Sequence, residues 1–396
     1  MMHIRRRKKI VVFGMMGKSP VAGMVWLTMQ YVAGLARLGF DVYYVEAHAR
    51  TPSQFTTSPE NDGSIEASAF IDSVMRWFGL PDGHWAFQAL HSDRRCYGLS
   101  DVQLAELYRS ADLIINLHGG TRVLPEHIAN GRLLFLETDP VEFAIYLAQD
   151  LQEMIDYMAP HAWFFTWGEN YGKPDCQTPV SNRFQFKPTR QPVVLDLWQP
   201  FANGAGELFT TVASWRQPRR EVKFDGEAYQ WSKHHQFLKV IDLPTLTTQR
   251  FELALAAYSD TDRLLLESKG WRVRDATTVS GDLGEYRQYI CRSRGEFTIA
   301  KDQYARPRSG WFSDRTATYL AAGRPVITQE TGFSNHLPTG EGLFGFSSME
   351  EILDAVDRIN SDYERHSRAA ADIARECFSH DVVLPRMLSE VGLWPL

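Results

Sequence analysis

The stretch Ser309–Phe333, "SGWFSDRTATYLAAGRPVITQETGF", combines a glycine turn, a short helix, a second glycine and an apolar strand. Ser313 occupies the position of a helix N-cap, and Asp314 and Arg315 follow in the first turn. Amide groups at a helix N-terminus lack helical partners, and the helix dipole adds partial positive charge there. Because Gly310 has no Cβ, an anion can approach the backbone closely. The stretch therefore suits a diphosphate at the start of this helix, although the pattern alone favours a plain capped helix after a tight turn.

Polar groups around the turn fit the same ligand. Ser309 and Ser313 would donate hydroxyl hydrogen bonds to a diphosphate. Lys301 and Arg308 would compensate its charge. Asp314 instead favours the plain cap, because a carboxylate at a helix entrance competes with a phosphate, and it would suit ribose hydroxyls or an arginine partner.

The composition bounds the class of protein. A chain of 396 residues is too long for one comfortable core and suits two domains. Hydrophobic residues make up 44% and charged residues 23%, as in ordinary soluble globular proteins. The net charge of −6 argues against nucleic acid as the main partner, because a phosphate backbone needs a basic face. The four cysteines form no CxxC pair, so we expect reduced thiols in a cytoplasmic protein.

The N-terminus resembles a secretion signal only superficially. Basic residues precede a short apolar run that Gly14 interrupts and Lys18 follows. This pattern is better interpreted as a first β-strand behind a basic tail. No stretch approaches the length of a membrane span, so we expect no stable membrane anchor.

The first half alternates strands and helices, which predicts a parallel, doubly wound sheet. Gly14 and Gly17 turn the chain from the first strand into a helix, and Gly39 ends that helix. The expected strands lie at 8–14, 40–47, 111–120, 131–140 and 162–170, and the expected helices at 22–38, 64–79, near Pro125 and at 141–158.

A proline-rich segment at 187–200 breaks this alternation and is interpreted as a linker. A second series of strands is expected at 207–214, 236–244, 251–259, 270–276, 295–302 and 324–330. We therefore predict a first Rossmann-like domain (1–186), the linker, a second Rossmann-like domain (201–378) and a C-terminal helical tail (379–396). The fold class is α/β, with two domains that face a central cleft at their carboxyl strand edges.

Several motifs resemble glycosyltransferases of the GT-B architecture. The segment "GRPVI", Gly323–Ile327, is similar to the end of the helix that carries the donor diphosphate in that group. The longer run from Gly295 to Phe333 resembles a group of bacterial glycosyltransferase-like proteins, as do "FTTVASW", "TRQPVVLDLW" and "TWGENYGKPDC". The matches extend from about Thr166 to Phe346.

The resemblance implies a nucleotide-sugar donor on the second domain and a hydroxyl-bearing acceptor on the first. It favours a role in binding the donor sugar for Gln329, Glu330, Thr331 and Gly332, which form the loop after the strand; a polar loop with a glycine turn explains these residues equally well without it. It also implies that the C-terminal helices pack back on the first domain. No cofactor is expected beyond the nucleotide-diphosphate sugar as co-substrate.

One position departs from the pattern of retaining members. These carry a ribose-binding glutamate five residues before the glycine of "GxPVI", and Thr318 stands there. Asp314, one turn earlier on the same helix face, takes that role, or the nucleotide is held differently. Thr318 therefore favours an inverting mechanism slightly.

An inverting transfer needs a general base for the acceptor hydroxyl. His118, Asp139 and Glu169 each follow a predicted strand of the first domain, at the edge where parallel sheets bind ligands. Taken singly, each residue is better explained by capping or hydrogen bonding than by catalysis. His118 is the strongest candidate by position, with contact to the donor sugar as its alternative role.

The first loop and the histidine pair offer weaker signals. Gly17 lies where backbone amides can reach a diphosphate, but the loop matches neither a Walker motif nor a dinucleotide fingerprint, and a simple strand-to-helix turn is a serious competitor. His234 and His235, expected on a strand, would point to opposite faces and suit no metal. We predict a metal-independent hexosyltransferase, although one DxD pattern, Asp260–Asp262, occurs in the sequence.

Two alternatives stay open: a catalytically silent module that binds a nucleotide or sugar, and a nucleotide-sugar epimerase of the same architecture. The acceptor class spans small molecules, natural products and glycans. A homodimer is compatible with the sequence.

Overall fold

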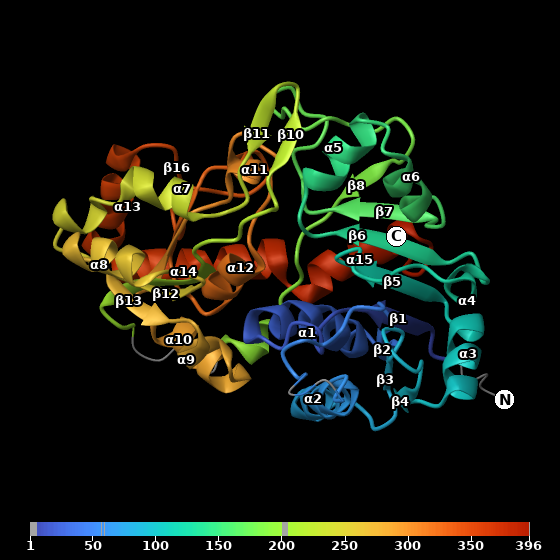
Figure 1. The fold of residues 1–396 in the computed structure, drawn as a ribbon. Helices are drawn as coiled ribbons and strands as arrows, with labels where there is room; N and C mark the ends of the chain where they lie inside the picture. Colours follow the sequence, from blue (N-terminus) through green and yellow to red (C-terminus); the bar gives the residue numbers. More distant parts are fainter. Residues whose placement is uncertain (1–5, 57, 59, 200–204, 396) are drawn as a thin grey trace.

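The computed structural model describes residues 6–56, 58, 60–199 and 205–395, and each half of the chain builds its own parallel sheet (Figure 1). The expected α/β class with two sheet bodies is confirmed. Within the described residues, no helix is long and apolar enough to cross a membrane.

The first sheet has the strand order β4-β3-β2-β1-β5-β6-β7-β8. Its strands are β1 (Lys9–Phe13), β2 (Asp41–Glu46), β3 (Trp85–Gln88), β4 (Cys96–Gly98), β5 (Leu113–Leu117), β6 (Leu133–Glu137), β7 (Trp163–Thr166) and β8 (Phe186–Pro188). The strand order changes direction at β1, which pairs with both β2 and β5. The loops after these strands therefore lie at one edge of the sheet. The β1, β5 and β6 runs are apolar because both faces of the sheet are covered.

The antiparallel hairpin of β3 and β4 was not predicted from the sequence. Both strands are short, at four and three residues, and provide little periodic signal. Gly98 permits the pairing, because its φ is +78° and an added Cβ would lie 2.4 Å from the carbonyl oxygen of Trp85.

The helices of the first half are α1 (Ala22–Arg37), α2 (Ser64–Trp77), α3 (Asp101–Ser110), α4 (Pro125–Ile128), α5 (Glu142–Ala148) and α6 (Gln152–Met158). The single helix expected at 141–158 is wrong: it is divided at Asp150, whose φ is +51°. α5 can therefore point its residues toward the second half while α6 stays on the first sheet (Figure 1).

The second sheet has the order β13-β12-β9-β14-β15-β16 and is parallel throughout. Its strands are β9 (Leu208–Ser214), β12 (Arg250–Ala256), β13 (Arg272–Asp275), β14 (Gly295–Thr298), β15 (Val326–Gln329) and β16 (Leu343–Phe346). A separate antiparallel hairpin consists of β10 (Val222–Phe224) and β11 (Glu227–Tyr229).

The strand expected at 236–244 is wrong, because this segment is helical. It contains α7 (His234–Phe237) and two 3₁₀ turns, Leu238–Val240 and Leu243–Thr245. Phe237, Val240 and Leu243 recur every third residue and enter one buried cluster, a helical spacing. His234 and His235 consequently stand on a helix, with ring centroids 3.8 Å apart.

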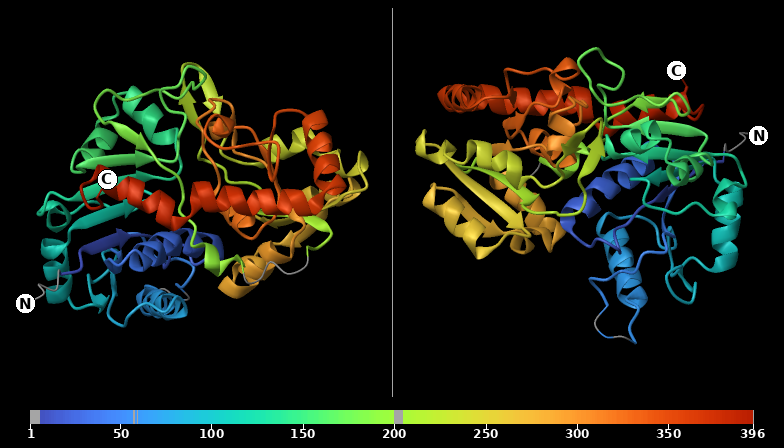
Figure 2. Two further views of the ribbon diagram at one scale, coloured as in Figure 1. Left: turned by 180° about the vertical axis from the view of Figure 1, so that it is seen from behind. Right: turned by 45° about the horizontal axis from the view of Figure 1, so that its top comes forward.

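The remaining helices are α8 (Asp260–Ser268), α9 (Thr277–Ser280), α10 (Leu283–Arg292), α11 (Asp302–Ala305), α12 (Asp314–Ala321), α13 (Met349–Ser361), α14 (Tyr363–Ile373) and α15 (His380–Glu390). A π-helical turn, Ala374–Phe378, joins α14 to α15 as the chain returns to the first half (Figure 2). Leu384, Met387 and Leu388 of α15 share a buried cluster with β1 and α1. The two halves are thus connected by covalent chain twice, at 189–207 and at this return.

Candidate active site

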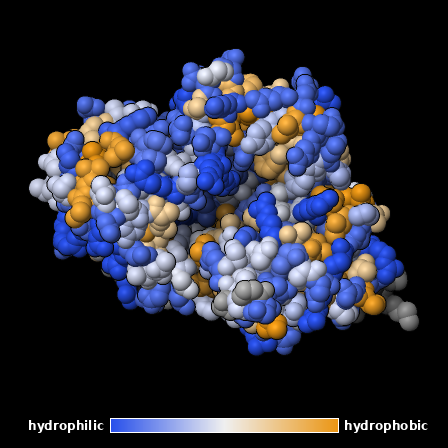
Figure 3. Space-filling model, viewed as in Figure 1, coloured by the Kyte–Doolittle hydropathy of each residue, from blue (hydrophilic) through white to orange (hydrophobic). Residues whose placement is uncertain are grey.

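A cavity of about 500 Å³ lies between the two halves. The first half contributes the start of α1, Gln54 and Asp139, and the second half contributes the chain after β9, β12, β13 and β14 and the start of α12. Figure 3 shows this face hollowed between the halves, with hydrophilic residues around the opening. Because strand ends and one helix N-terminus converge here, the cavity lies where open parallel sheets bind ligands.

The N-terminus of α12 opens into this cavity as the motif predicted. Ser313 is the N-cap residue, but its hydroxyl makes no capping hydrogen bond. The first helical bond runs from the Ala317 amide to the Ser313 carbonyl, at 3.0 Å, so the amides of 314–316 have no helical partner. The amides of Asp314 and Arg315 bond to the Asp314 carboxylate, so an anion would meet the uncommitted serine hydroxyl and compete with that carboxylate for the amides.

Lys233 is the cation that sequence reasoning missed. It lines the cavity, is 8% exposed, and its ammonium has no hydrogen bond or ion pair to any described residue. Burial lowers the pKa of Lys233 well below its usual range, and the nearby charges of Arg315 and Lys301 lower it further. A buried ammonium without a partner is costly, so this position favours an anionic ligand. No motif in the sequence singles out Lys233.

Lys301 joins the two halves beside the same cavity. Its Nζ lies 3.3 Å from Oδ1 of Asp139 and 3.1 Å from the Tyr304 hydroxyl, and that hydroxyl donates to the same carboxylate oxygen. Burial raises the pKa of Asp139, but Lys301 and Tyr304 outweigh this and leave it below its usual range. Burial lowers the pKa of Lys301 to about 8, against the opposing effect of Asp139. Asp139 is therefore ionised at neutral pH and faces the cavity.

The chain after Asp139 is strained. Val141 has φ +91° and ψ −50°, an outlier for a β-branched residue that costs on the order of 1–3 kcal/mol. Trp311 adds a further link between the halves, because its indole N–H donates to the carbonyl of Thr138 at 3.0 Å.

Arg315 and Asp314 have different roles from one another. Arg315 is committed to the protein: its guanidinium contacts Glu296 at 2.6 Å, the Val212 carbonyl at 2.7 Å and the Thr298 hydroxyl at 2.9 Å. Asp314 lines the cavity, and burial raises its pKa to about 6. Its charge is therefore present at neutral pH and lost on mild acidification.

The structure reverses the interpretation of Gly310. Its φ is +81°, and an added Cβ would lie 2.4 Å from the backbone nitrogen of Asn170, so the close approach comes from the first half rather than from a phosphate. Ser309 is fully buried, and its hydroxyl donates to the Tyr304 carbonyl at 3.2 Å. Arg308 pairs with Asp175 at 2.9 Å. Arg308, Ser309 and Gly310 thus form an interdomain contact and do not line the cavity.

Asn170 is the centre of that contact. It is fully buried, its amide N–H donates to the Ser309 carbonyl, and its side chain donates to the Arg308 carbonyl at 2.9 Å. Its side-chain oxygen accepts from Asn335 at 3.0 Å and lies 3.2 Å from His336. These bonds bring the backbones of the two halves together at Gly310, where a side chain would not fit.

The predicted sugar loop also lies outside the cavity. Gln329 donates to Gln236 at 3.1 Å, the Glu330 carboxylate accepts from the Gly332 amide at 2.5 Å, and the Thr331 hydroxyl donates to the Trp311 carbonyl at 2.5 Å. Thr318 donates back to the Arg315 carbonyl at 2.6 Å and borders only a separate space of about 10 Å³. None of the five predicted residues, Gln329, Glu330, Thr331, Gly332 and Thr318, lines the large cavity.

Gly17 is likewise committed within the protein. Its amide donates to Oε1 of Glu46 at 2.5 Å, and this fully buried carboxylate also accepts from Tyr44 at 2.5 Å. His48 contacts the other oxygen at 2.9 Å. A buried carboxylate beneath the loop opposes the binding of a diphosphate at Gly17.

The other two base candidates are separated from the cavity lining. Nδ1 of His118 lies 2.8 Å from the Thr138 hydroxyl, and burial lowers the pKa of His118 to about 4. Glu169 pairs with Arg190 at 2.8 Å in a different cavity, of about 350 Å³, beside α15. Asp139 alone of the three predicted bases lines the cavity.

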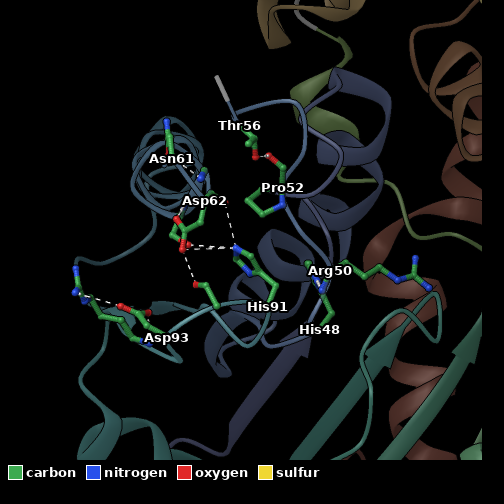
Figure 4. Close-up of polar contacts among 12 residues, drawn as sticks. His48, Arg50, Pro52, Thr56, Asn61, Asp62, His91 and Asp93 are labelled. Atoms are coloured by element: carbon green, nitrogen blue, oxygen red, sulfur yellow. Dashed lines mark hydrogen bonds and ion pairs between the residues drawn. The ribbon is translucent and has the colours of Figure 1, made fainter. Parts of the chain in front are cut away.

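The loops after β2 and β3 are held together by polar contacts (Figure 4). Nε2 of His91 lies 3.1 Å from the Asp62 carbonyl and 3.5 Å from the Ser64 hydroxyl, while Ser92 donates to the Asp62 carboxylate. Because Ser64 and Asp62 meet the same ring nitrogen, the group cannot act as a Ser-His-Asp relay. In Figure 4 the Arg50 side chain points away from this network.

No group of three or more His, Cys, Asp or Glu side chains within the described residues is arranged to hold a metal ion. All four cysteines are free.

Comparisons agree with this architecture. A family described as "Glycosyl transferase-like" matches residues 232–383. No curated protein sequence matches the chain. HepE from Anabaena, solved with UDP and glucose, is 13% identical, with 98% of this chain and 100% of that chain covered and a TM-score of 0.54.

Two further structures are equally similar. AviGT4, a glycosyltransferase involved in avilamycin A biosynthesis, is 11% identical, covers 97% of each chain and gives a TM-score of 0.53. The pneumococcal O-GlcNAc transferase GtfA, solved with UDP and GlcNAc, is 9% identical, with 98% of this chain and 100% of that chain covered and a TM-score of 0.55. The chain therefore has the GT-B fold of glycosyltransferases and carries a glycosyl transferase-like domain over residues 232–383.

Proposed function

We propose that the protein transfers a sugar from a nucleoside-diphosphate sugar to a hydroxyl-bearing acceptor. The observation that carries this proposal is the unpartnered ammonium of Lys233 in one cavity with the uncommitted Ser313 hydroxyl and the N-terminal amides of α12. Together they provide positive charge and hydrogen-bond donors for a diphosphate. The UDP bound to HepE and GtfA supports the same ligand class.

The nucleoside and the sugar would extend in opposite directions from this diphosphate. The lining at Ala276, Thr277 and Tyr286 consists of uncharged side chains and would suit a nucleoside. Asp314 lies between that lining and the diphosphate donors, where its carboxylate can accept from ribose hydroxyls. The opposite end, near Asp139 and Lys301, would receive the transferred sugar.

The chemistry is a single displacement. The acceptor oxygen forms a bond to the anomeric carbon, the bond from that carbon to the diphosphate oxygen breaks, and Asp139 takes the acceptor proton. Lys233, Ser313 and the helix amides stabilise the charge that develops on the leaving diphosphate. These groups can neutralise it without a metal ion. Thr318 in place of a ribose-binding glutamate supports inversion at the anomeric carbon.

Calorimetric titration with UDP, GDP, ADP and dTDP, followed by assay of UDP release from UDP-glucose, tests the proposal. We expect saturable binding of one nucleoside diphosphate and slow hydrolysis of its sugar. Ser313→Asp should abolish binding, because it places a carboxylate against the diphosphate, without a loss of Tm. If no nucleoside diphosphate binds to the folded protein, the proposal fails.

A nucleotide-binding module without transfer activity is a second candidate. The observation in its favour is that Asn170 fills the space at Gly310 where a donor was expected from the sequence. Saturable donor binding without hydrolysis or transfer would support this module, and isomerisation of the sugar without release of nucleotide would support an epimerase.

A further inference from the structure

The β10–β11 hairpin belongs to the second half of the chain but packs on the first half. Figure 1 shows it at the top of the view, between α11 and α5. Gln149, just after α5, donates to the Lys223 carbonyl at 2.8 Å. The hairpin and α5 share one buried apolar cluster, which consists of Val141, Ile145, Val222, Tyr229, Trp231 and Tyr304.

Trp231 connects this hairpin to the cavity. The Nζ of Lys301 lies 3.1 Å from the centroid of the indole ring, and the guanidinium carbon of Arg220 lies 3.5 Å from it. The indole N–H donates to Gln217 at 2.8 Å, which fixes the ring plane. A cation held against an aromatic face loses freedom to leave it, so the ring fixes where Lys301 stands.

Val141 connects the same hairpin to Asp139. Its side chain is 1% exposed within the hairpin cluster, and its amide donates to the Tyr171 hydroxyl at 2.7 Å. It holds a positive φ two residues after Asp139. Such a conformation persists only where surrounding contacts enforce it, and here those contacts come from Tyr171 and from the hairpin of the other half.

We propose that Val141 and Trp231 are positioning residues, and that the hairpin closes over Val141 so that Asp139 and Lys301 meet across the cavity. The hairpin packs against the turn at Val141. The Trp231 ring, just after the hairpin, holds the Lys301 ammonium in place. The role in catalysis rests on the proposed function, since Asp139 and Lys301 are the groups it would assemble.

Release of the hairpin should therefore separate the pair without unfolding either sheet. The turn after Asp139 would relax toward negative φ, and the Lys301 ammonium, whose side chain is 13% exposed, would become accessible. Neither Lys233 nor Ser313 belongs to the hairpin cluster, so the affinity for nucleoside diphosphate should stay unchanged.

Amine labelling of Lys301 in the full-length protein measures this release directly and needs no ligand. The labelled peptide is quantified by mass spectrometry over time for wild type, Val141→Ala and Trp231→Leu. We expect both variants to label about tenfold faster, because a loss of ~1.4 kcal/mol in positioning raises the open fraction tenfold. Trp231→Phe keeps an aromatic face and should stay near wild type.

Val141→Gly separates positioning from packing. Glycine adopts a positive φ without strain, so this variant should label more slowly than Val141→Ala although it fills less space. If Val141 matters only for packing, Val141→Gly should label faster than Val141→Ala. Leu147→Ala is the matched control: it removes a buried side chain of α5 that packs in a different cluster, and it should lower Tm without faster labelling.

Turnover completes the test. With UDP-glucose, Val141→Ala and Trp231→Leu should lower kcat and leave the Kd for UDP unchanged. Labelling rates equal to wild type in both variants would overturn the positioning role. Failure of wild type to bind any nucleoside diphosphate would overturn the proposed function alone, because the labelling result stands without a ligand.

Discussion

The ammonium of Lys301 and the carboxylate of Asp139 lie 3.3 Å apart, although the two residues are separated by 162 positions in the sequence. Lys301 follows β14 and Asp139 follows β6, so the pair joins the carboxyl edges of the two sheets. An acid and a base therefore meet beside the cavity only because both halves fold and dock.

Replacement of Lys233 by methionine should weaken the binding of nucleoside diphosphates by about 10- to 100-fold. The loss corresponds to one charged hydrogen bond of about 1.5–3 kcal/mol. Tm in the absence of ligand should rise, because the variant no longer buries an unpartnered cation. Calorimetry and thermal denaturation measure the two effects. Lys239→Met, an exposed lysine a short distance along the chain, is the control and should change neither.

Asp139→Asn tests the proposed base. The amide keeps the hydrogen bond from Tyr304 but cannot take a proton, so turnover should fall by about 10²- to 10⁴-fold with little change in donor affinity. The exposed Asp357→Asn on α13 is the control. If turnover survives in Asp139→Asn, Asp139 is not the base, and His118 becomes the next candidate.

Asp314→Asn tests contact with the ribose. Removal of the charge should strengthen the binding of inorganic pyrophosphate, while loss of the carboxylate acceptor should weaken UDP relative to pyrophosphate by about tenfold or more. Burial raises the pKa of Asp314 to about 6, so wild type should approach the variant's pyrophosphate affinity as the pH falls below that value. An unchanged ratio of UDP to pyrophosphate affinity in the variant would exclude contact between Asp314 and the ribose.

Gly310→Ala should destabilise the protein through the contact with Asn170. The substitution adds about 1–2 kcal/mol for a positive φ and about 1–3 kcal/mol for a Cβ placed 2.4 Å from a backbone nitrogen. Gly39 has φ +92°, and no atom lies within 4 Å of an added Cβ. Gly39→Ala should therefore lose only the free energy that the positive φ costs. Denaturant unfolding compares the two. Equal losses of unfolding free energy would contradict the close approach.

Glu137→Gln should change the pH dependence of stability. Glu137 is fully buried, and burial raises its pKa from the usual 4.5 to about 8, so the folded protein holds a proton that the unfolded chain releases. The free energy of unfolding in wild type therefore decreases from about pH 4.5 up to about pH 8 on account of this group. The variant lacks that decrease, and its Tm relative to wild type should rise between about pH 5 and pH 9. A constant difference across that range would contradict the assignment.

Much of the fold could be predicted because it is encoded in short runs. The apolar segments around β1, β5 and β6 and the glycine after α1 have local physical causes, namely burial on both sheet faces and termination of a helix. The predictions were wrong where elements are short or where tertiary contacts decide: β3 and β4, the break at Asp150 and the helical turns at 236–244.

The site, like the fold, could be predicted only where it depends on local features of the chain. Ser313 and Lys301 were predicted because a capped helix and a strand end are local features. Gly310 has the backbone freedom inferred for it, but its neighbour is Asn170, which lies 140 positions earlier. A glycine indicates that something approaches closely and does not indicate what.

The sequence by itself determined two parallel α/β units and a helix whose N-terminus opens toward a shared edge, since hydrophobic periodicity, caps and turns act over a few residues. Only the tertiary structure decided that Lys233 is buried without a partner, that Asp139 meets Lys301, and that Trp231 and Val141 share one cluster across the halves. Such relationships depend on how the two units dock, and contacts between residues distant in the chain leave no periodic pattern in it.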